Sequence, residues 1–307
     1  MRAAALGLLA LAACAQAGPP PGAPAGSGLT FVALGDQPYN MLDVGAYGRL
    51  IDRINTLAPA FAIHVGDIKD GSSACTDRVF KERLAEFQRF RVPLIYTPGD
   101  NEWTDCHRSG GDPAERLVRL RALFFPAPAS LGAPALPLAT QAARGFPENA
   151  RWSRDGVTLA TLHVVGSRNN RGRDRAEFEA RSAANLAWLE EAFAAAKAAG
   201  HRAVVLAMQA DPGFQPRPRP EHGFAELLAA LVAAARGFDG TVLLIHGDSH
   251  AYVFDRPLKD AAGRPVENLI RLEVPGGHGD VRAVAVTLSP GAPDPVAVRQ
   301  VDPEPPR

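Results

Sequence analysis

The chain has 307 residues, of which 46% are hydrophobic and 21% charged, a composition that is ordinary for a globular protein and sufficient for a large core. Its 33 basic and 33 acidic residues cancel, and the arginines are scattered instead of gathered on one helical face, which argues against a nucleic-acid-binding protein. Beyond the N-terminal segment, no stretch has the length and purity to cross a membrane.

The N-terminus has the pattern of an export signal. Arg2 precedes an apolar stretch over residues 3–13, which is too short to span a bilayer and typical of the hydrophobic region of a secretory signal. The stretch runs into Leu11-Ala12-Ala13-Cys14, which resembles the lipobox of bacterial lipoproteins, in which the cysteine is lipidated. Ala15-Gln16-Ala17 offers a competing cleavage site for an ordinary signal peptide.

These features predict four parts of the chain. Residues 1–17 form the signal peptide, with lipidation at Cys14, and the Pro/Gly/Ala-rich stretch 18–28 is a flexible tether. Residues 29–289 form one globular domain, and the Pro-rich tail 290–307 is disordered. We therefore expect an exported protein, periplasmic or anchored in the outer membrane, that contacts a membrane only through its lipid.

Short apolar runs alternate with helix-length segments along the domain. The runs typical of buried parallel strands cover residues 29–34, 61–65, 94–97, 157–165, 203–208 and 241–246. Helical patterns cover residues 45–57, 76–90, 114–124, 181–199 and 223–236. Three further runs, without helices between them, read as closing strands over residues 251–255, 269–274 and 282–288. This order predicts an α/β sandwich whose second sheet is completed late in the chain, with 126–147 as a long surface loop that serves as a lid or binding loop.

Four of these apolar runs end in the same dipeptide, Gly-Asp. The four pairs are Gly35-Asp36, Gly66-Asp67, Gly99-Asp100 and Gly247-Asp248. Parallel sheets place their sites in the loops after the strands, so the four carboxylates are expected to converge. Two unit charges ~4 Å apart repel by roughly 4 kcal/mol at an effective dielectric near 20, so such a cluster must take up protons or hold cations. The pattern favours a divalent metal site; the alternative is that Gly-Asp is common turn chemistry after a strand.

Two cysteines remain in the exported domain. In an oxidising compartment a lone pair is most simply a disulfide, here Cys75 with Cys106. Such a bridge would join the loops that follow Asp67 and Asp100. The alternative, a nucleophile and base made of Cys106 and His107, is disfavoured because side chains adjacent in sequence seldom face each other.

From residue 31 to about residue 288, the chain resembles the metallophosphoesterases of the calcineurin-like superfamily. Gly35-Asp36 fits the first motif of that family, and Gly66-Asp67-Ile68-Lys69-Asp70 fits its GDxxD motif without change. Gly99-Asp100-Asn101-Glu102 stands where GNHE is expected, and Gly247-Asp248-Ser249-His250 aligns with GHxH. The resemblance implies a four-layer α/β/β/α sandwich, two divalent metal ions, and hydrolysis of a small-molecule phosphate mono- or diester.

The departures from the family pattern replace nitrogen ligands by oxygen ligands. The first motif reads Asp36-Gln37-Pro38 and so lacks its histidine, Asp100 replaces the ligand Asn, and Gln209 and Asp248 replace histidines. Oxygen donors favour Mn²⁺, Mg²⁺ or Ca²⁺ over Zn²⁺. Carried over by position, Asp67 would bridge two ions. The ligand sets would be Asp36, Asp67 and His250 at one ion, and Asp67, Asp100, Gln209 and Asp248 at the other.

The histidine that protonates the leaving group in the family is Asn101 here. An amide cannot serve as that acid, although it can donate a hydrogen bond to a phosphate oxygen. His107 is the first candidate for a replacement acid and His278 the second. The other histidines of the strands, His64, His163 and His246, sit within apolar runs and are expected in core or supporting positions.

Three functions are compatible with these features. The first is an exported metal-dependent phosphoesterase, favoured by the retained Asp67 and the other three aspartates. The second is a non-catalytic metal- or phosphate-binding lipoprotein on the same fold, favoured by Asn101. A purely structural envelope protein would leave the converging carboxylates unexplained.

Overall fold

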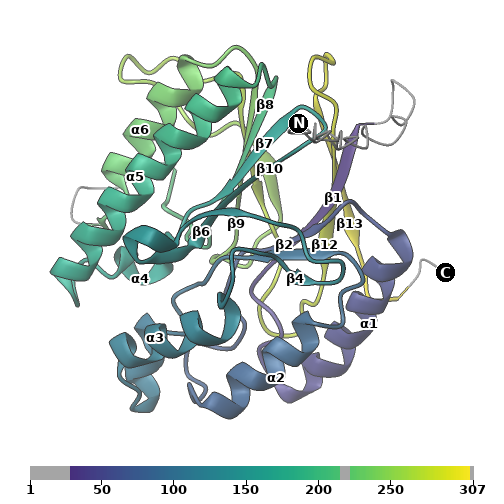
Figure 1. Cartoon of the computed structure of the whole chain (residues 1–307), viewed down its shortest axis with the longest axis vertical. Helices are drawn as coiled ribbons and strands as arrows, with labels where there is room; N and C mark the ends of the chain where they lie inside the picture. The colour runs from purple at the N-terminus through teal and green to yellow at the C-terminus, as the bar shows by residue number, and fades with distance from the viewer. Residues whose placement is uncertain (1–27, 215–221, 305–307) are drawn as a thin grey trace, which may run out of the picture.

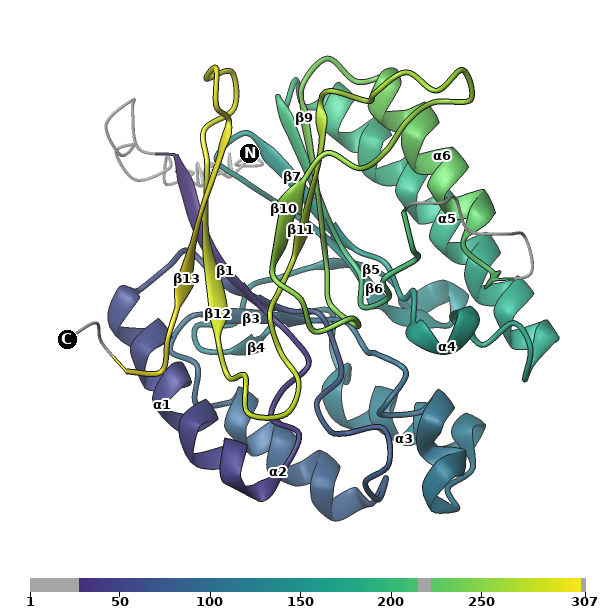
Figure 2. The same cartoon turned by 180° about the vertical axis from the view of Figure 1, so that it is seen from behind.

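Two β-sheets face each other, and helices cover the outer face of each sheet in the computed structural model (Figures 1 and 2). The structure describes residues 28–214 and 222–304. This architecture is the four-layer α/β/β/α sandwich that the sequence predicts. The predicted signal peptide, Cys14 and residues 18–27 of the tether lie outside the described residues. Within the described residues, no helix combines the length and apolarity needed to span a membrane.

The first sheet has six strands in the order β13-β12-β1-β2-β3-β4. Their bounds are β1 Leu29–Leu34, β2 Ala62–His64, β3 Pro93–Tyr96, β4 Leu131–Gly132, β12 Ala283–Leu288 and β13 Val296–Val301. β1, β2 and β3 are parallel, and Val32 pairs with Ala62, which pairs with Leu94. The loops that follow these three strands therefore leave the sheet at one edge.

The second sheet has seven strands in the order β10-β11-β9-β8-β7-β6-β5. Their bounds are β5 Ala139–Gln141, β6 Phe146–Arg154, β7 Val157–Thr161, β8 Ala203–Ala207, β9 Thr241–His246, β10 Val253–Asp255 and β11 Leu269–Glu273. β7, β8, β9 and β11 are parallel, with Val204 beside Val242. The loop after β9 carries the fourth Gly-Asp pair.

The helices and the sheets enclose three apolar layers. α1 (Met41–Leu57), α2 (Asp77–Phe87) and α3 (Pro113–Phe124) pack on the first sheet, and α5 (Arg175–Ala198) and α6 (Ala225–Arg236) pack on the second (Figure 2). The middle layer is formed by buried residues of both sheets. Short turns of helix complete the fold: α4 Gly166–Asn169, and two 3₁₀ turns at Thr104–Ser109 and Ala142–Arg144.

Two helices begin earlier than their apolar periodicity predicts. α1 begins at Met41 because the Asn40 side chain accepts hydrogen bonds from the backbone N–H groups of Leu42 and Asp43. α5 begins at Arg175, six residues before the predicted start, because Asp174 caps the N–H of Glu177.

Two of the expectations about loops are wrong. The stretch 126–147 contains β4, β5 and the start of β6, so it is not one structureless loop. The tail is not wholly disordered, because β13 lies within it and pairs antiparallel with β12. Its Val296 and Val301 are buried, and this burial explains why a segment among prolines is a strand. The last predicted strands also do not all complete the second sheet, because β12 pairs with β1 of the first.

Candidate metal centre

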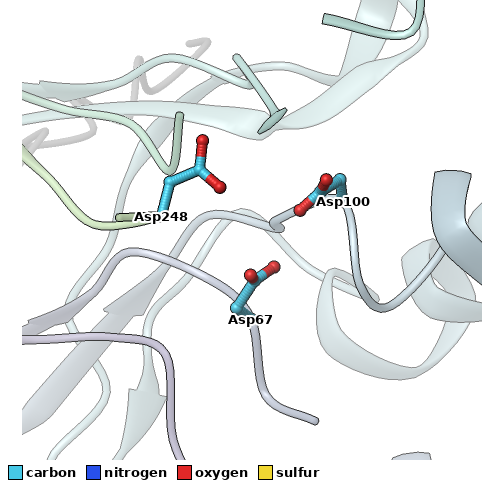
Figure 3. Close-up of side chains that lie close together, drawn as sticks. All are labelled: Asp67, Asp100 and Asp248. Carbon is cyan, nitrogen blue, oxygen red and sulfur yellow. The ribbon is translucent and has the colours of Figure 1, made fainter. Parts of the chain in front are cut away.

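Three carboxylates converge in the cleft where the strand ends of the two sheets meet. Asp67 follows β2, Asp100 follows β3 and Asp248 follows β9, and each offers an oxygen within 4.8 Å of the others. Figure 3 shows the three side chains pointing toward one another from separate loops. The cleft around them has a volume of about 410 Å³. Three of the four carboxylates of the Gly-Asp pairs therefore converge within the described residues.

The glycines of two Gly-Asp pairs make room for these carboxylates. A Cβ on Gly99 would lie 2.0 Å from Asp67 Oδ1, and a Cβ on Gly247 would lie 2.0 Å from Asp36 Oδ2. Both distances are far inside van der Waals contact, so any larger residue would displace the carboxylate beside it. Glycine before the aspartate of one strand thus makes room for the aspartate of another.

The buried carboxylates are electrostatically costly without a cation. Burial, followed by the charges of Asp248 and Asp105, raises the pKa of Asp100 to about 7. Burial raises the pKa of Asp248 to about 6. Burial and neighbouring carboxylates also raise the pKa of Asp67 and of Asp36 well above the usual range. The cluster therefore favours either protons or positive ions.

Asp36 and His250 lie beside this cluster and are joined to it by Tyr39. Both oxygens of Asp36 accept from the backbone N–H of Asp248, at 3.1 and 3.2 Å. The Tyr39 hydroxyl lies 3.1 Å from Asp67 Oδ2, 3.4 Å from Asp36 Oδ1 and 3.0 Å from His250 Nε2. Burial and the charges of Asp67 and Asp36 raise the pKa of Tyr39 well above its usual value. Sequence reasoning missed Tyr39, since no motif marks the third residue after Asp36.

Asn101 and Glu102 hold the Asp67 and Asp100 loops together. The Asn101 amide nitrogen donates to Asp67 Oδ2 at 2.7 Å, and its backbone N–H donates to Asp67 Oδ1 at 3.1 Å. Glu102 Oε1 accepts from the backbone N–H groups of Asp67 and Gly99. Asn101 therefore orients the Asp67 carboxylate through two hydrogen bonds. It also lines the cleft, so it would contact a group bound there.

Gln209 lies at the predicted position, but its carbonyl oxygen is already engaged. Gln209 Oε1 accepts from the backbone N–H of Gly166 at 2.7 Å, so ligation of an ion would use the remaining lone pair. Its amide nitrogen is buried, and the Gln209 side chain lowers the pKa of Asp248 against the larger effect of burial.

The predicted disulfide is present and links the two ligand-bearing loops. Cys75 and Cys106 are bonded, with their Cα atoms 5.5 Å apart and 31 positions apart in sequence. The pairing excludes Cys106 as a free nucleophile. It joins the segment after Asp67 to the turn after Asp100.

The chain is similar to known proteins in structure but not in sequence. No protein-family model matches the chain, and no curated protein is significantly similar in sequence. A purple acid phosphatase from yellow lupin seeds superposes with a TM-score of 0.56 and 13% identity, covering 90% of this chain and 52% of that one. A dimetal phosphatase from Danio rerio superposes with a TM-score of 0.51 and 14% identity, covering 91% of this chain and all of that one. The chain therefore shares the fold of these two phosphatases.

A protein described as an anchor has the same fold. GAP50, described as the anchor in the inner membrane complex of Plasmodium, superposes with a TM-score of 0.53 and 11% identity, covering 91% of this chain and 85% of that one. At such identities the dimetal phosphatase fold is shared, whereas the activity must be argued from the residues of this chain.

The residues of the cleft fit divalent ions. Asp67, Asp100 and Asp248 are hard oxygen donors with open positions toward the cleft, and their raised pKa values show that positive charge is favoured there. Such ions in a dimetal phosphatase fold would replace the protons that the carboxylates otherwise bind.

The two candidate acids lie outside the carboxylate cluster. His107 Nδ1 is 2.8 Å from the carbonyl oxygen of Thr104, to which it donates, and its Nε2 accepts from Arg173 at 2.7 Å. This pattern describes a neutral imidazole in a neighbouring groove. His278 is exposed, and its Nε2 lies 3.0 Å from Asp70 Oδ2.

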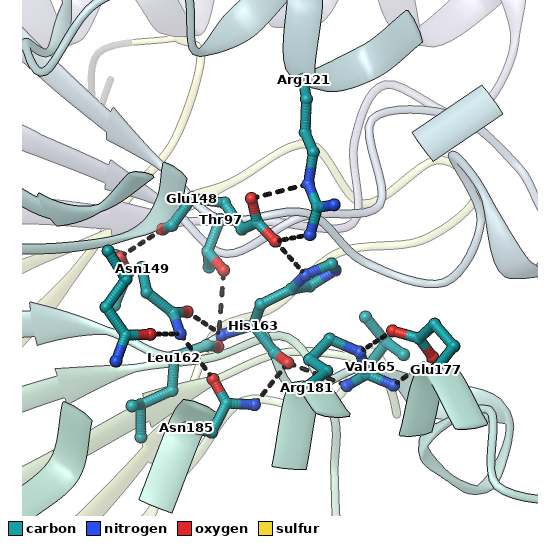
Figure 4. A network of polar contacts seen from close by, with 12 residues as sticks. Thr97, Arg121, Glu148, Asn149, Leu162, His163, Val165, Glu177, Arg181 and Asn185 are labelled. Carbon is teal, nitrogen blue, oxygen red and sulfur yellow. Dashed lines mark hydrogen bonds and ion pairs between the residues drawn. The ribbon is translucent and has the colours of Figure 1, made fainter. Parts of the chain in front are cut away.

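The histidines expected in supporting positions are buried. Figure 4 shows the polar contacts of one of them, His163. His163 Nδ1 lies 2.7 Å from Glu148 Oε1, and Arg121 donates to both oxygens of the same carboxylate. Burial alone would raise the pKa of Glu148, but His163 and Arg121 outweigh it and lower this pKa to about 2. This network joins β6 to α3 and to the segment that follows β7.

Strained backbone concentrates at the cleft. Of the ten non-glycine residues with positive φ in the described chain, four belong to the predicted ligand sets: Asp36, Asp67, Asp248 and His250. Four more are consecutive, from Ser167 to Asn170, and form a left-handed turn in the segment between β7 and α5. Such positions cost on the order of 1 kcal/mol each and persist only where the surroundings enforce them.

A buried arginine enforces the left-handed turn. Arg181 is fully buried in α5 and donates to the Asn169 side chain at 2.6 Å and to the Asn169 carbonyl oxygen at 3.0 Å. It also donates to the carbonyl oxygen of His163 and to Glu177 (Figure 4). The turn places Ser167 and Arg168 on the rim of the cleft.

Proposed function

We propose that this chain is an exported metal-dependent phosphoesterase that hydrolyses a phosphate mono- or diester. The observation that carries the proposal is the cluster of Asp67, Asp100 and Asp248 on a fold shared with dimetal phosphatases. Export, with a lipid anchor at Cys14, is part of the proposal and rests on the N-terminal sequence alone.

The residues divide into two ligand sets around a shared carboxylate. Asp36, Asp67 and His250 would hold one ion, and Asp67, Asp100 and Asp248, with Gln209, the other. Divalent ions supply Lewis acidity and charge neutralisation when bound, and the oxygen-rich set favours Mn²⁺, Mg²⁺ or Ca²⁺.

Asn101 limits which phosphate esters the protein can hydrolyse. It donates to Asp67 and can donate to a phosphate oxygen, but it cannot protonate a leaving group. We therefore expect esters with acidic leaving groups, such as p-nitrophenyl phosphate, to be hydrolysed faster than alkyl esters, which need that proton.

Metal stoichiometry tests the proposal directly. The chain lacking residues 1–17 would be incubated with Mn²⁺, dialysed and measured by elemental analysis, beside Asp67→Asn and a control, Asp155→Asn, at an exposed turn. We expect nearly two ions per chain in the unchanged chain and the control, loss of ions in Asp67→Asn, and p-nitrophenyl phosphate hydrolysis that follows the ion content. Absence of bound ions would overturn the enzyme assignment.

A binding protein on the same fold is the second candidate. Asn101 at the acid position and the neutral, engaged His107 favour it. Its signature would be retention of Mn²⁺ that depends on Asp67, with binding of inorganic phosphate but without turnover of any aryl phosphate.

A further inference from the structure

A second cavity of about 440 Å³ adjoins the carboxylate cleft. Three arginines line it, Arg108, Arg168 and Arg173, together with His107, Ser167 and Asn170. We call this cavity the arginine groove. Asp105, Arg108 and Ser167 line both the groove and the carboxylate cleft, so the two form one continuous surface.

The positive charge of the arginine groove is only partly compensated. Its single carboxylate, Asp105, is buried and is paired with Arg108 at 2.8 Å. Arg173 donates to the neutral His107 and forms no ion pair with a carboxylate in residues 28–214 and 222–304. The guanidinium of the exposed Arg168 donates no hydrogen bond within the same residues. Two guanidinium groups are therefore available to a ligand.

The groove is built by the strained turn and not by a mobile surface loop. Arg168 lies at φ 58° in the middle of the left-handed turn that the buried Arg181 fixes. Asn170 is 3% exposed and its side-chain nitrogen donates to Glu177, whereas its side-chain oxygen, Oδ1, has no partner in the described residues. The groove thus combines two free cations with an unsatisfied acceptor.

We propose that the arginine groove binds a second phosphate of the substrate, carried by the alcohol part of the ester that the carboxylate cleft hydrolyses. This inference rests on the proposed function. A phosphate monoester carries nearly two negative charges at neutral pH, which matches the two free guanidinium groups, whereas a carboxylate would neutralise one. The substrates are then phosphoesters of an alcohol that bears a further phosphate, with a hydroxyl or amine available to Asn170.

Binding of a series of synthetic ligands of increasing chain length tests the proposal. Straight-chain alkanediol bisphosphates of two to six carbons would be compared with the monophosphates of the same chains, by calorimetry on the protein in Mn²⁺. We expect at least one length at which the bisphosphate binds about tenfold tighter than its monophosphate, since charged hydrogen bonds to phosphate are strong.

Arginine variants test whether the preference for the bisphosphate arises in the arginine groove. Arg168→Gln and Arg173→Gln should each remove most of this preference and leave monophosphate binding unchanged. Arg175→Gln is the matched control, because Arg175 is 72% exposed in the same segment and pairs with Glu179 outside the groove. Thermal melting of all three variants would confirm that each is folded.

The two proposals fail separately. Equal binding of both ligands at every length, or a preference that survives in Arg168→Gln and Arg173→Gln, would overturn the arginine groove while hydrolysis of p-nitrophenyl phosphate upheld the phosphoesterase. A preference that depends on both arginines, in a protein that hydrolyses no ester, would support the groove and overturn the enzyme.

Discussion

Tyr39 is the side chain on which both proposed ligand sets depend. Its hydroxyl lies within 3.1 Å of Asp67 and 3.0 Å of His250, and Asn101 donates to it at 3.2 Å. We expect Tyr39→Phe to weaken Mn²⁺ binding about tenfold, because one lost charge-assisted hydrogen bond is worth roughly 1.5 kcal/mol. Titration of Mn²⁺ into the chelated protein measures this, with the exposed Tyr252→Phe as control. Unchanged or tighter binding would show that Tyr39 only fills space or competes with the ion.

Residue by residue, the sequence predicted the acids and missed what orients them. The aspartates were predictable because each follows a strand of fixed direction, and the carboxyl ends of parallel strands meet at one edge. Tyr39 was not, since the direction of a loop side chain follows no period. The neutral state of His107 depends on Arg173, which lies 66 positions away and could not be paired with it from the sequence.

At the scale of the elements, α5 supports the rim of the site through one buried side chain. Arg181→Gln would leave the Asn169 carbonyl oxygen without its donor, remove one of the two donors to the His163 carbonyl oxygen, and release the left-handed turn. We expect a loss of about 2–4 kcal/mol in the free energy of unfolding, measured in urea. Arg175→Gln, six residues earlier in the same helix, should change stability by less than about 0.5 kcal/mol, because its ion pair is exposed. Equal effects of the two changes would contradict the assigned role.

The disulfide is an element-scale constraint on the Asp67 and Asp100 loops. The double change Cys75→Ser with Cys106→Ser removes a bridge between positions 31 residues apart. We expect this change to lower the free energy of unfolding by roughly 3–4 kcal/mol, chiefly by freeing the unfolded chain. Urea denaturation of the unchanged protein should shift to the same midpoint when reductant is added. A midpoint that does not respond to reductant would contradict this expectation.

The elements that sequence reasoning missed are those that do not present a continuous apolar run. β6 carries Glu148 and Asn149, both buried, and their polarity is satisfied by partners on α3, α5 and the segment after β7. Periodicity cannot anticipate a buried polar residue whose partners lie elsewhere in the chain. β4 and β5 are edge strands of two and three residues, and β13 follows a Pro-rich turn, so propensity and length both argued against them.

At the scale of the whole molecule, the cleft makes the stability of the metal-free protein depend on pH. In the unfolded chain each aspartate has a pKa near 3.9. In the folded cleft the pKa of Asp248 is raised to about 6 and the pKa of Asp100 to about 7. Between these values the folded state binds more protons than the unfolded state, so stability falls as pH rises and reaches its lower plateau above about pH 7. The raised pKa of Asp100 alone corresponds to roughly 4 kcal/mol at that plateau, with burial the largest cause.

In a chelator, we therefore expect the protein to be more stable at pH 5 than at pH 8, with a difference of several kilocalories per mole. Divalent ions should reverse the trend, because they bind the deprotonated carboxylates and stabilise only the folded state. Asp100→Asn removes one buried charge, so the chelated variant should be more stable than the unchanged protein at pH 8 and should vary less with pH. Urea unfolding at pH 5, 6, 7 and 8, with chelator or with Mn²⁺, measures all three effects. If the chelated protein were equally stable at pH 5 and pH 8, the carboxylates would not repel one another in the folded state, and the physical reason for a cation in this cleft would be lost.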